Sequence, residues 1–403
     1  MATSAQPQPT TIKPAIEPLA PPPPSLAVVR GEAYPGPTAT DGQKLVWVRG
    51  LLSATDAEHL QRCRKASFNL LQAHGRQYLA WSKKSKSWDE TPVDPNEVRV
   101  TMNYIRPILR AHTRRLLPTR IDYQITPDSS SADARDKAVV GERFLAASYA
   151  RLELHQKIDQ ALELAFCSGL CFLQPFWNPT TGAAVPAQLY LDVPATDDQG
   201  QPVFDEMGQP VTQQQLVYVD ASGQPVETAD EAFWFRPGDV DVSVRSVFNV
   251  RWNPEAKGFS SGDGLRWLID MEPIPVADAR LQFPEYAAKI QPSAAADAYL
   301  TYERLGAAAS QGRTQVATTT TSSQSLDGAT TMLVRYWELP TPHFQHGRLI
   351  VLAGDCVVFD GDFPNGGMLP YIPVYDEPAP LTAGGRASVD DMVGPQEIGR
   401  AHV

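Results

Sequence analysis

The spacing of apolar residues changes along this chain, and that change constrains the fold more than any other feature. In the first half, apolar residues recur every three or four positions, as at Leu154, Ile158 and Leu162, which predicts amphipathic helices. Beyond Asn178 they alternate with polar residues, as in 239–247, which predicts half-buried strands. Helices followed by strands predict an α+β fold with a helical N-terminal half and a β-rich half.

Four helices are predicted from periodic apolar faces, at 53–71, 94–117, 133–149 and 152–168. Pro107 lies within the second, which predicts a kink or a restart near Arg106. Gly169 follows the fourth and is a predicted C-cap. A short strand is expected at 121–126.

The later part of the chain predicts strands and turns. Strands are expected at 170–177, 239–247, 265–271 and 332–338, with a hairpin at 346–359 and a short helix at 275–281. The phrase Gly-Gln-Pro-Val occurs at 200–203, 208–211 and 223–226. Glycine favours turns and proline suits edge strands, so the phrase predicts hairpin tips. Repeat-based ligand binding is the alternative.

Composition divides the chain into segments. The prediction is a disordered Pro-rich arm (1–44), a mainly helical part (45–178), a β-rich part (179–290) with a hairpin insertion at about 196–230, a low-complexity Ala/Ser/Thr linker (291–331), strands completing the body (332–386) and the start of a helix (387–396).

The end of the chain carries two further expectations. Ser388 is a predicted N-cap, with two acids in the first turn of the helix that follows. Residues 397–403 resemble the translation of a sequencing-library adapter, which predicts a non-native tail after a truncated gene. An ordinary frayed C-terminus is the alternative.

Composition also argues against several functions. A net charge of −11 is unlike that of proteins that grip DNA phosphates tightly. The four cysteines predict no disulfide framework, and His59 with Cys63, like His343 with His346, offers two ligands where zinc takes three or four. No phosphate loop, nucleophile elbow or zinc-protease motif is present, so we predict no catalytic residue, no metal and no cofactor.

The absence of a signal peptide or an apolar run long enough for a membrane span predicts a soluble protein.

One segment departs from the acidic balance. Residues 76–120 hold ten Lys and Arg against four acids. Arg106, Arg110 and Arg114 follow one another at four-residue intervals, so they form a stripe on one side of a helix. The stripe is interpreted either as a solvated face that pairs with acids elsewhere or as a surface that faces an anion or another subunit.

Several blocks, taken in order, resemble the portal (head-to-tail connector) proteins of tailed bacteriophages. They include Asn103-Tyr-Ile-Arg-Pro107, a strand and two helices leading to Gly169, the strand 247–254 that closes in an Asn-Pro turn, and 388–396. The positions that match the family pattern are Asn103, Pro107, Trp252, Pro254 and Gln396. The resemblance covers about residues 75 to 396. The family continues past the glutamine into a long helix that is missing here, which puts ring closure and terminase docking by this chain in doubt.

The resemblance implies a structural role without enzymatic activity. It implies a homo-oligomeric ring, typically a dodecamer, at one capsid vertex, through which double-stranded DNA is packaged and ejected without tight binding. Implied partners are the capsid protein, the terminase large subunit and head-completion or adaptor proteins. The protein would be assembled in the host cytoplasm and located in the virion. Another virion component, such as an adaptor or tail protein, and an unrecognised hydrolase are the alternatives.

Overall fold

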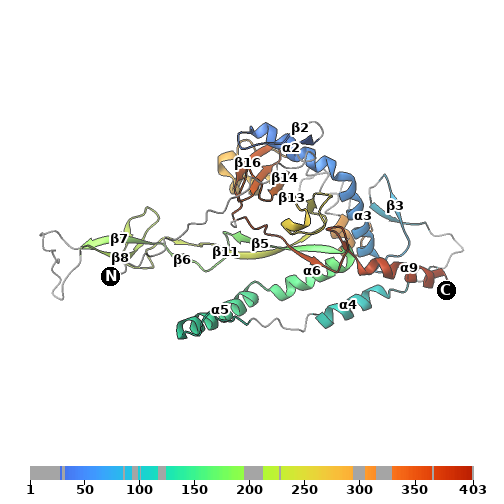
Figure 1. The fold of residues 1–403 in the computed structure, drawn as a ribbon, viewed down its shortest axis with the longest axis horizontal. Helices are drawn as coiled ribbons and strands as arrows, with labels where there is room; N and C mark the ends of the chain where they lie inside the picture. The colour runs from blue at the N-terminus through green and yellow to red at the C-terminus, as the bar shows by residue number, and fades with distance from the viewer. Residues whose placement is uncertain are drawn as a thin grey trace, which may run out of the picture. The chain divides into compact units, whose positions relative to one another are not determined.

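The structure of the protein is a computed structural model (Figure 1). It describes residues 28–29, 32–84, 87–92, 99, 101–116, 124–194, 212–226, 228–293, 305–314, 329–364 and 367–401. The chain divides into two units, the first formed by 1–174 with 244–403 and the second by 175–243. Both helices and antiparallel sheets are present, which confirms the predicted α+β class.

The helices of the first unit are α2 (Asp41–Ala54), α3 (Asp56–Ala73), α4 (Ile105–Leu116), α5 (Ala132–Arg151), α6 (Leu154–Ser168), α7 (Val276–Gln282) and α9 (Ser388–Ala401), with 3₁₀ turns η1 (Ser261–Asp263) and η2 (Pro284–Tyr286). The predictions for α5, α6 and α7 are confirmed within a few residues.

The boundary between the predicted N-terminal arm and the helical part differs from the prediction. Helix α2, which the sequence analysis did not predict, begins inside the segment assigned to the disordered arm. A capping box starts it, because the Thr40 amide donates to the Gln43 side chain at 2.9 Å and the Thr40 hydroxyl accepts from the Gln43 amide at 3.5 Å. The predicted arm up to residue 27 lies outside the described residues.

Helix α4 also begins later than predicted. Residues 101–104 are not helical, and 93–98 lie outside the described part of the chain. Pro107 lies in the first turn of α4, where a missing N–H costs no hydrogen bond, so the restart near Arg106 is confirmed and no kink is needed. The predicted strand at 121–126 is not formed at 124–126, where the Ile125 amide donates to Glu142 at 2.9 Å instead.

A five-stranded antiparallel sheet forms the centre of the first unit, in the order β12-β13-β14-β15-β16. Its strands are β12 (Val250–Trp252), β13 (Trp267–Pro275), β14 (Thr330–Glu338), β15 (Arg348–Ala353) and β16 (Cys356–Gly361). Neighbouring side chains enter opposite cores: Ile269 packs in a cluster with Trp47 of α2, whereas Leu268 packs in the larger cluster that contains Leu71 of α3. The sheet is therefore buried on both faces.

The remaining strands form smaller sheets. In the first unit, β17 (Ile372–Tyr375) pairs with the start of β5 (Leu170–Asn178). The other strands there are β11 (Asp239–Ser246), whose first residues fall in the second unit, and the pairs β1 (Val28–Val29) with β2 (Glu32–Ala33), β3 (Leu79–Ser82) with β4 (Ser87–Glu90), and β18 (Glu377–Pro378) with β19 (Gly385–Arg386).

The second unit consists of β-hairpins. Its strands are β6 (Val185–Pro186), β7 (Gln188–Pro194), β8 (Thr212–Val219), β9 (Pro225–Val226) and β10 (Trp234–Phe235). The third Gly-Gln-Pro-Val phrase forms the tip between β8 and β9, where Gly223 has φ +80°, so this hairpin prediction is confirmed. The phrases at 200–203 and 208–211 lie outside the described residues.

The predicted linker at 291–331 is not uniform. Residues 305–310 are helical, and both Leu305 and Ala309 are fully buried, which a low-complexity composition did not suggest. Strand β14 begins at Thr330, just before the predicted boundary. The stretches 294–304 and 315–328 lie outside the described residues.

At α9, the predicted helix is confirmed but its cap is not. Ser388 is the first helical residue, and its amide donates to the Asp376 carboxylate, so Asp376 takes the capping role assigned to Ser388. Asp390 and Asp391 occupy the first turn as predicted. The helix continues to Ala401; the origin of the tail remains a prediction.

Gly169 ends α6 with φ +82°, which confirms the predicted C-cap. A Cβ placed on it would lie 2.4 Å from the Gly385 carbonyl oxygen. We expect Gly169→Ala to lower the free energy of unfolding by about 2 kcal/mol or more, since it adds left-handed strain to a backbone clash. Gly394→Ala in α9, where a Cβ meets nothing within 4 Å, is the control and should leave stability unchanged or higher. Urea unfolding measures both; equal effects would contradict the explanation.

Candidate functional site

Helix α4 separates a buried side from a basic side. Ile105 and Leu109 are buried in the main core, which fixes the rotation of the helix. At its N-terminus, the Asn103 side chain accepts from the Arg106 amide at 3.2 Å and donates to the Ala73 carbonyl at 2.9 Å, which ties the start of α4 to the end of α3. These contacts direct Arg110 and Arg114 away from the core.

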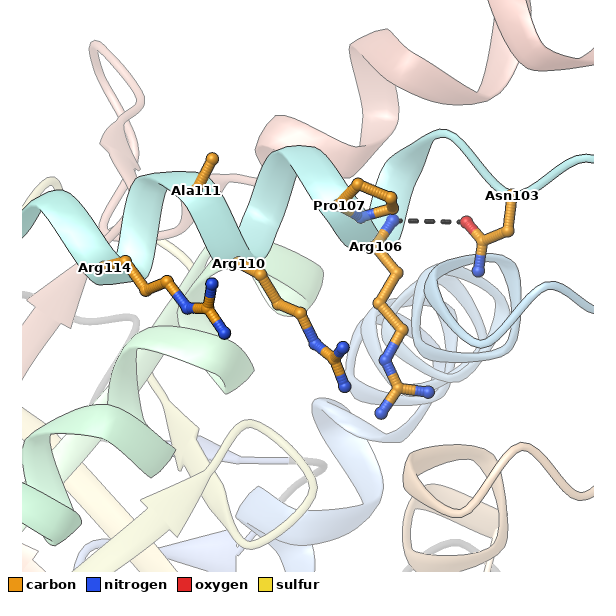
Figure 2. Close-up of a pocket in the computed structure, with 6 residues that line it drawn as sticks. All are labelled: Asn103, Arg106, Pro107, Arg110, Ala111 and Arg114. Atoms are coloured by element: carbon orange, nitrogen blue, oxygen red, sulfur yellow. Dashed lines mark hydrogen bonds between the residues drawn. The ribbon is translucent and has the colours of Figure 1, made fainter.

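Figure 2 shows the arginine stripe, meaning Arg106, Arg110 and Arg114, along one side of α4. With Asn103, Pro107 and Ala111 these residues line a surface pocket of about 550 Å³. The structure therefore brings the three predicted site arginines together, beside two of the family-like positions. Within the described residues, none of the three guanidinium groups makes an ion pair or a hydrogen bond, so pairing with acids elsewhere in the chain is not observed there.

A second groove, of about 470 Å³, lies between α4 and α6. The arginine stripe lines it together with Asp159 and Glu163 of α6. Neither acid forms an ion pair with the stripe in the described part of the molecule. A groove with both charge signs would disfavour a uniformly anionic polymer and favour a protein surface of mixed charge.

Apolar side chains are exposed on the same helical layer. All of α5 is described, and among its 20 residues only Ala138 is buried. Val140 and Phe144 on α5 are 65% and 67% exposed, and on α4 Ile108 and Leu116 are exposed as well. Both helices pack against α6. Large exposed apolar side chains on a helix are typical of surfaces that contact another protein.

The other family-like positions lie away from the stripe. Trp252 is buried at the end of β12, with the Arg62 guanidinium 3.8 Å above its ring, and Pro254 is exposed in the following turn. Asn253 between them accepts from the Arg266 amide at 2.9 Å, which holds the turn. Gln396 is buried in α9, and its side-chain amide makes no hydrogen bond with the described residues. The five positions do not form one site.

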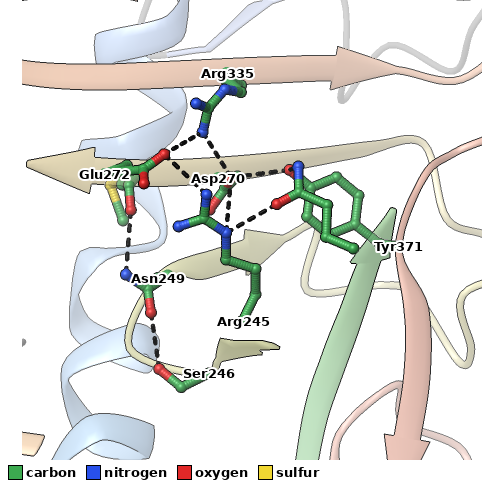
Figure 3. Close-up of polar contacts among 9 residues, drawn as sticks. Arg245, Ser246, Asn249, Asp270, Glu272, Arg335 and Tyr371 are labelled. Carbon is green, nitrogen blue, oxygen red and sulfur yellow. Dashed lines mark hydrogen bonds and ion pairs between the residues drawn. The ribbon is translucent and has the colours of Figure 1, made fainter. Parts of the chain in front are cut away.

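Sequence reasoning missed a buried ionic cluster between β11, β13 and β14 (Figure 3). Asp270 is fully buried; its Oδ2 accepts from Tyr371 Oη at 3.0 Å and from Arg335 Nη1 at 3.1 Å. Glu272 Oε2 accepts from Arg335 Nη1 at 2.7 Å and from Arg245 Nη2 at 2.8 Å. Two carboxylates thus face two guanidinium groups, so formal charge balances within the cluster.

The contacts within this cluster affect the pKa of Glu272 and link all of its polar groups. Burial would raise the pKa of Glu272, but Arg335 and Arg245 outweigh it and hold that pKa below its ordinary value. Gln174 closes the ring of contacts, because it accepts from Arg245 Nε at 2.8 Å and donates to Tyr371 Oη at 3.0 Å. Because the charged and polar groups of the cluster are bonded to one another, the cluster is suited to holding strands together.

The cysteines and histidines singled out by spacing lie apart from any cavity described above. Cys63 Sγ lies 3.4 Å from His59 Nε2, and both residues are buried. Burial raises the pKa of the Cys63 thiol to about 12 and lowers that of His59, so both are neutral core groups. Across the described ranges, no three His, Cys, Asp or Glu residues are placed to hold a metal ion. The absence of metal and cofactor remains a prediction.

In the described residues, no helix has both the length and the apolar content that crossing a membrane requires. A scan of protein-family models finds none that matches this chain, and a search among curated proteins finds no match either.

Proposed function

We propose that this chain is a structural subunit of a phage portal, in which copies assemble into a ring at a capsid vertex and double-stranded DNA passes through. The observation that carries the assembly role is the arginine stripe. Its three guanidinium groups have no ion-pair or hydrogen-bond partner among the described residues, and they lie on a helical layer that also exposes Val140 and Phe144. The portal assignment itself derives from the order of the sequence blocks, from Asn103 to Gln396.

The chemistry of the stripe and its surroundings favours a protein contact over a DNA contact. Arginine forms bidentate bonds with carboxylates and is common at protein interfaces. Asp159 and Glu163 line the groove beside the stripe and would repel phosphates. The net charge of −11 agrees with a conduit that lets DNA slide past without gripping it.

The proposal implies several partners. They are other copies of the subunit, capsid protein, the terminase large subunit and head-completion or adaptor proteins. It also implies assembly in the host cytoplasm and a location in the virion. No enzymatic step is assigned. The exposed α5 face would serve an adaptor or tail protein equally well, so another virion component remains the second candidate.

Electron microscopy of the protein expressed from its complete gene tests the proposal. We expect rings with an axial hole and, by native mass spectrometry, a single closed oligomer. A monomer at micromolar concentration, or an open filament, would contradict the portal assignment. A closed oligomer without a hole would favour the second candidate.

A further inference from the structure

A polar cluster fastens the segment before α2 to the central sheet. Tyr34 packs edge-on against Trp47 of α2, with ring centroids 5.5 Å apart, and its hydroxyl donates to Glu338 Oε1 at the end of β14. The Pro35 carbonyl accepts from Arg348 Nη1 at 2.6 Å. These contacts join positions about 300 residues apart in sequence, so residues 34–40 form a strap across the sheet.

The strap covers a buried carboxylate, Glu338 of β14, which forms no ion pair with the described residues. Arg348 is the cross-strand neighbour of Glu338 in β15, but its donors are committed elsewhere. Its Nε and Nη2 bond the two oxygens of Asp360 at 2.8 and 3.0 Å, and its Nη1 bonds Pro35. Glu338 Oε2 is shielded from solvent and accepts no hydrogen bond from the described residues. An ionised Glu338 is therefore poorly compensated.

The groups around Glu338 do little to stabilise its ionised form. The groups that face Glu338 are Tyr34 from the strap, Tyr336 from its own strand, Arg348 from β15 and Asp360 from β16. Lys44 of α2 pairs with Asp360 at 2.8 Å, and His343 stacks on Tyr34 at 6.4 Å. Burial, which Asp360 reinforces, outweighs Tyr34 and Arg348 and raises the pKa of Glu338 to about 7, from an ordinary value of 4.5.

We propose that the strap is a proton-dependent clasp: residues 34–40 stay fastened to the sheet while Glu338 carries a proton, and they detach more readily once it ionises. The sign follows from linkage. Detachment returns Glu338 to water and releases its proton, so opening becomes easier as pH rises from about 4.5 to about 7 and is constant above that range. This device is independent of the proposed portal role.

Hydrogen exchange of the intact protein, followed by mass spectrometry and corrected for intrinsic rates, measures the opening of residues 34–40. Between pH 5.5 and pH 8 the opening equilibrium should increase roughly 30-fold. Glu338→Gln should remove this dependence, whereas Glu285→Gln, an exposed glutamate of η2, should retain it. A flat wild-type profile, or an unchanged profile in Glu338→Gln, would overturn the proposal.

Two further variants keep the test informative if Glu338→Gln folds poorly. Tyr34→Phe removes the donor to ionised Glu338, so we expect extra opening at pH 8 and little change at pH 5.5. His343→Phe preserves the ring stacking on Tyr34 and removes the imidazole, and it should keep the wild-type profile. If His343→Phe flattened the profile, the histidine would be the sensor and the proposal would be wrong.

Discussion

Replacing Asp270 with alanine should lower the free energy of unfolding by about 3–5 kcal/mol. The side chain is fully buried, and its removal leaves Glu272 alone to balance Arg245 and Arg335. Tyr371 also loses its acceptor. An unbalanced positive charge is costly there, because the Arg245 and Arg335 side chains are only 15% and 20% exposed and water solvates them incompletely.

Chemical denaturation monitored by tryptophan fluorescence measures this loss. Asp270→Asn keeps the shape and one acceptor oxygen, so a smaller loss is expected. A double-mutant cycle with Arg335→Met should give a coupling energy of at least about 1.5 kcal/mol, since the two side chains are in contact at 3.1 Å. A loss below about 1 kcal/mol for Asp270→Ala would mean that water or a rearranged Arg335 compensates the charge.

Changing Arg106, Arg110 and Arg114 together to glutamate should prevent assembly while leaving the subunit folded. These side chains make no ion pair or hydrogen bond in the described part of the chain, so their reversal removes no observed internal contact. A surface change of this kind usually alters stability by less than about 0.5 kcal/mol per site. At an interface, the same reversal places like charges against each other, which costs several kcal/mol.

Native mass spectrometry and thermal unfolding together separate the two effects. The matched control reverses three exposed cations elsewhere in the same unit, Lys257, Lys289 and Arg313, and should assemble like the wild type. Normal assembly of the stripe variant would remove the stripe from the interface. A large fall in its melting temperature would instead show that the arginines stabilise the subunit.

The sequence predicted those parts of the fold that depend on local signals. Helices α5 and α6 and the strands of the central sheet have strong periodicity, and Gly169 has the geometry that a C-cap requires. Helix α2 was missed because its segment follows a Pro-rich stretch, although the Thr40 and Gln43 spacing is a capping signal. The start of α4 was placed too early because Asp94-Pro-Asn-Glu97 has the composition of a helix start.

Of the candidate sites, the arginine stripe could be predicted from local spacing, whereas the cluster around Asp270 could not. Four-residue spacing placed the arginine stripe on one side of α4, and the structure confirms that placement. The cluster around Asp270 depends on the register between β13 and β14, which sets Asp270 opposite Arg335, and on Arg245 arriving from β11. Charged residues within otherwise apolar strands were the available signal, but pairing them requires knowledge of strand order.

The contact between Gly169 and Gly385 has an evolutionary corollary. A Cβ on Gly385 would lie 1.8 Å from the Gly169 carbonyl oxygen, and both places are already occupied by the smallest residue. A larger residue at one position therefore cannot be compensated by a smaller residue at the other. We expect natural variants of this protein to retain glycine at both, or to lose both together through a deletion that reroutes the β18–β19 turn.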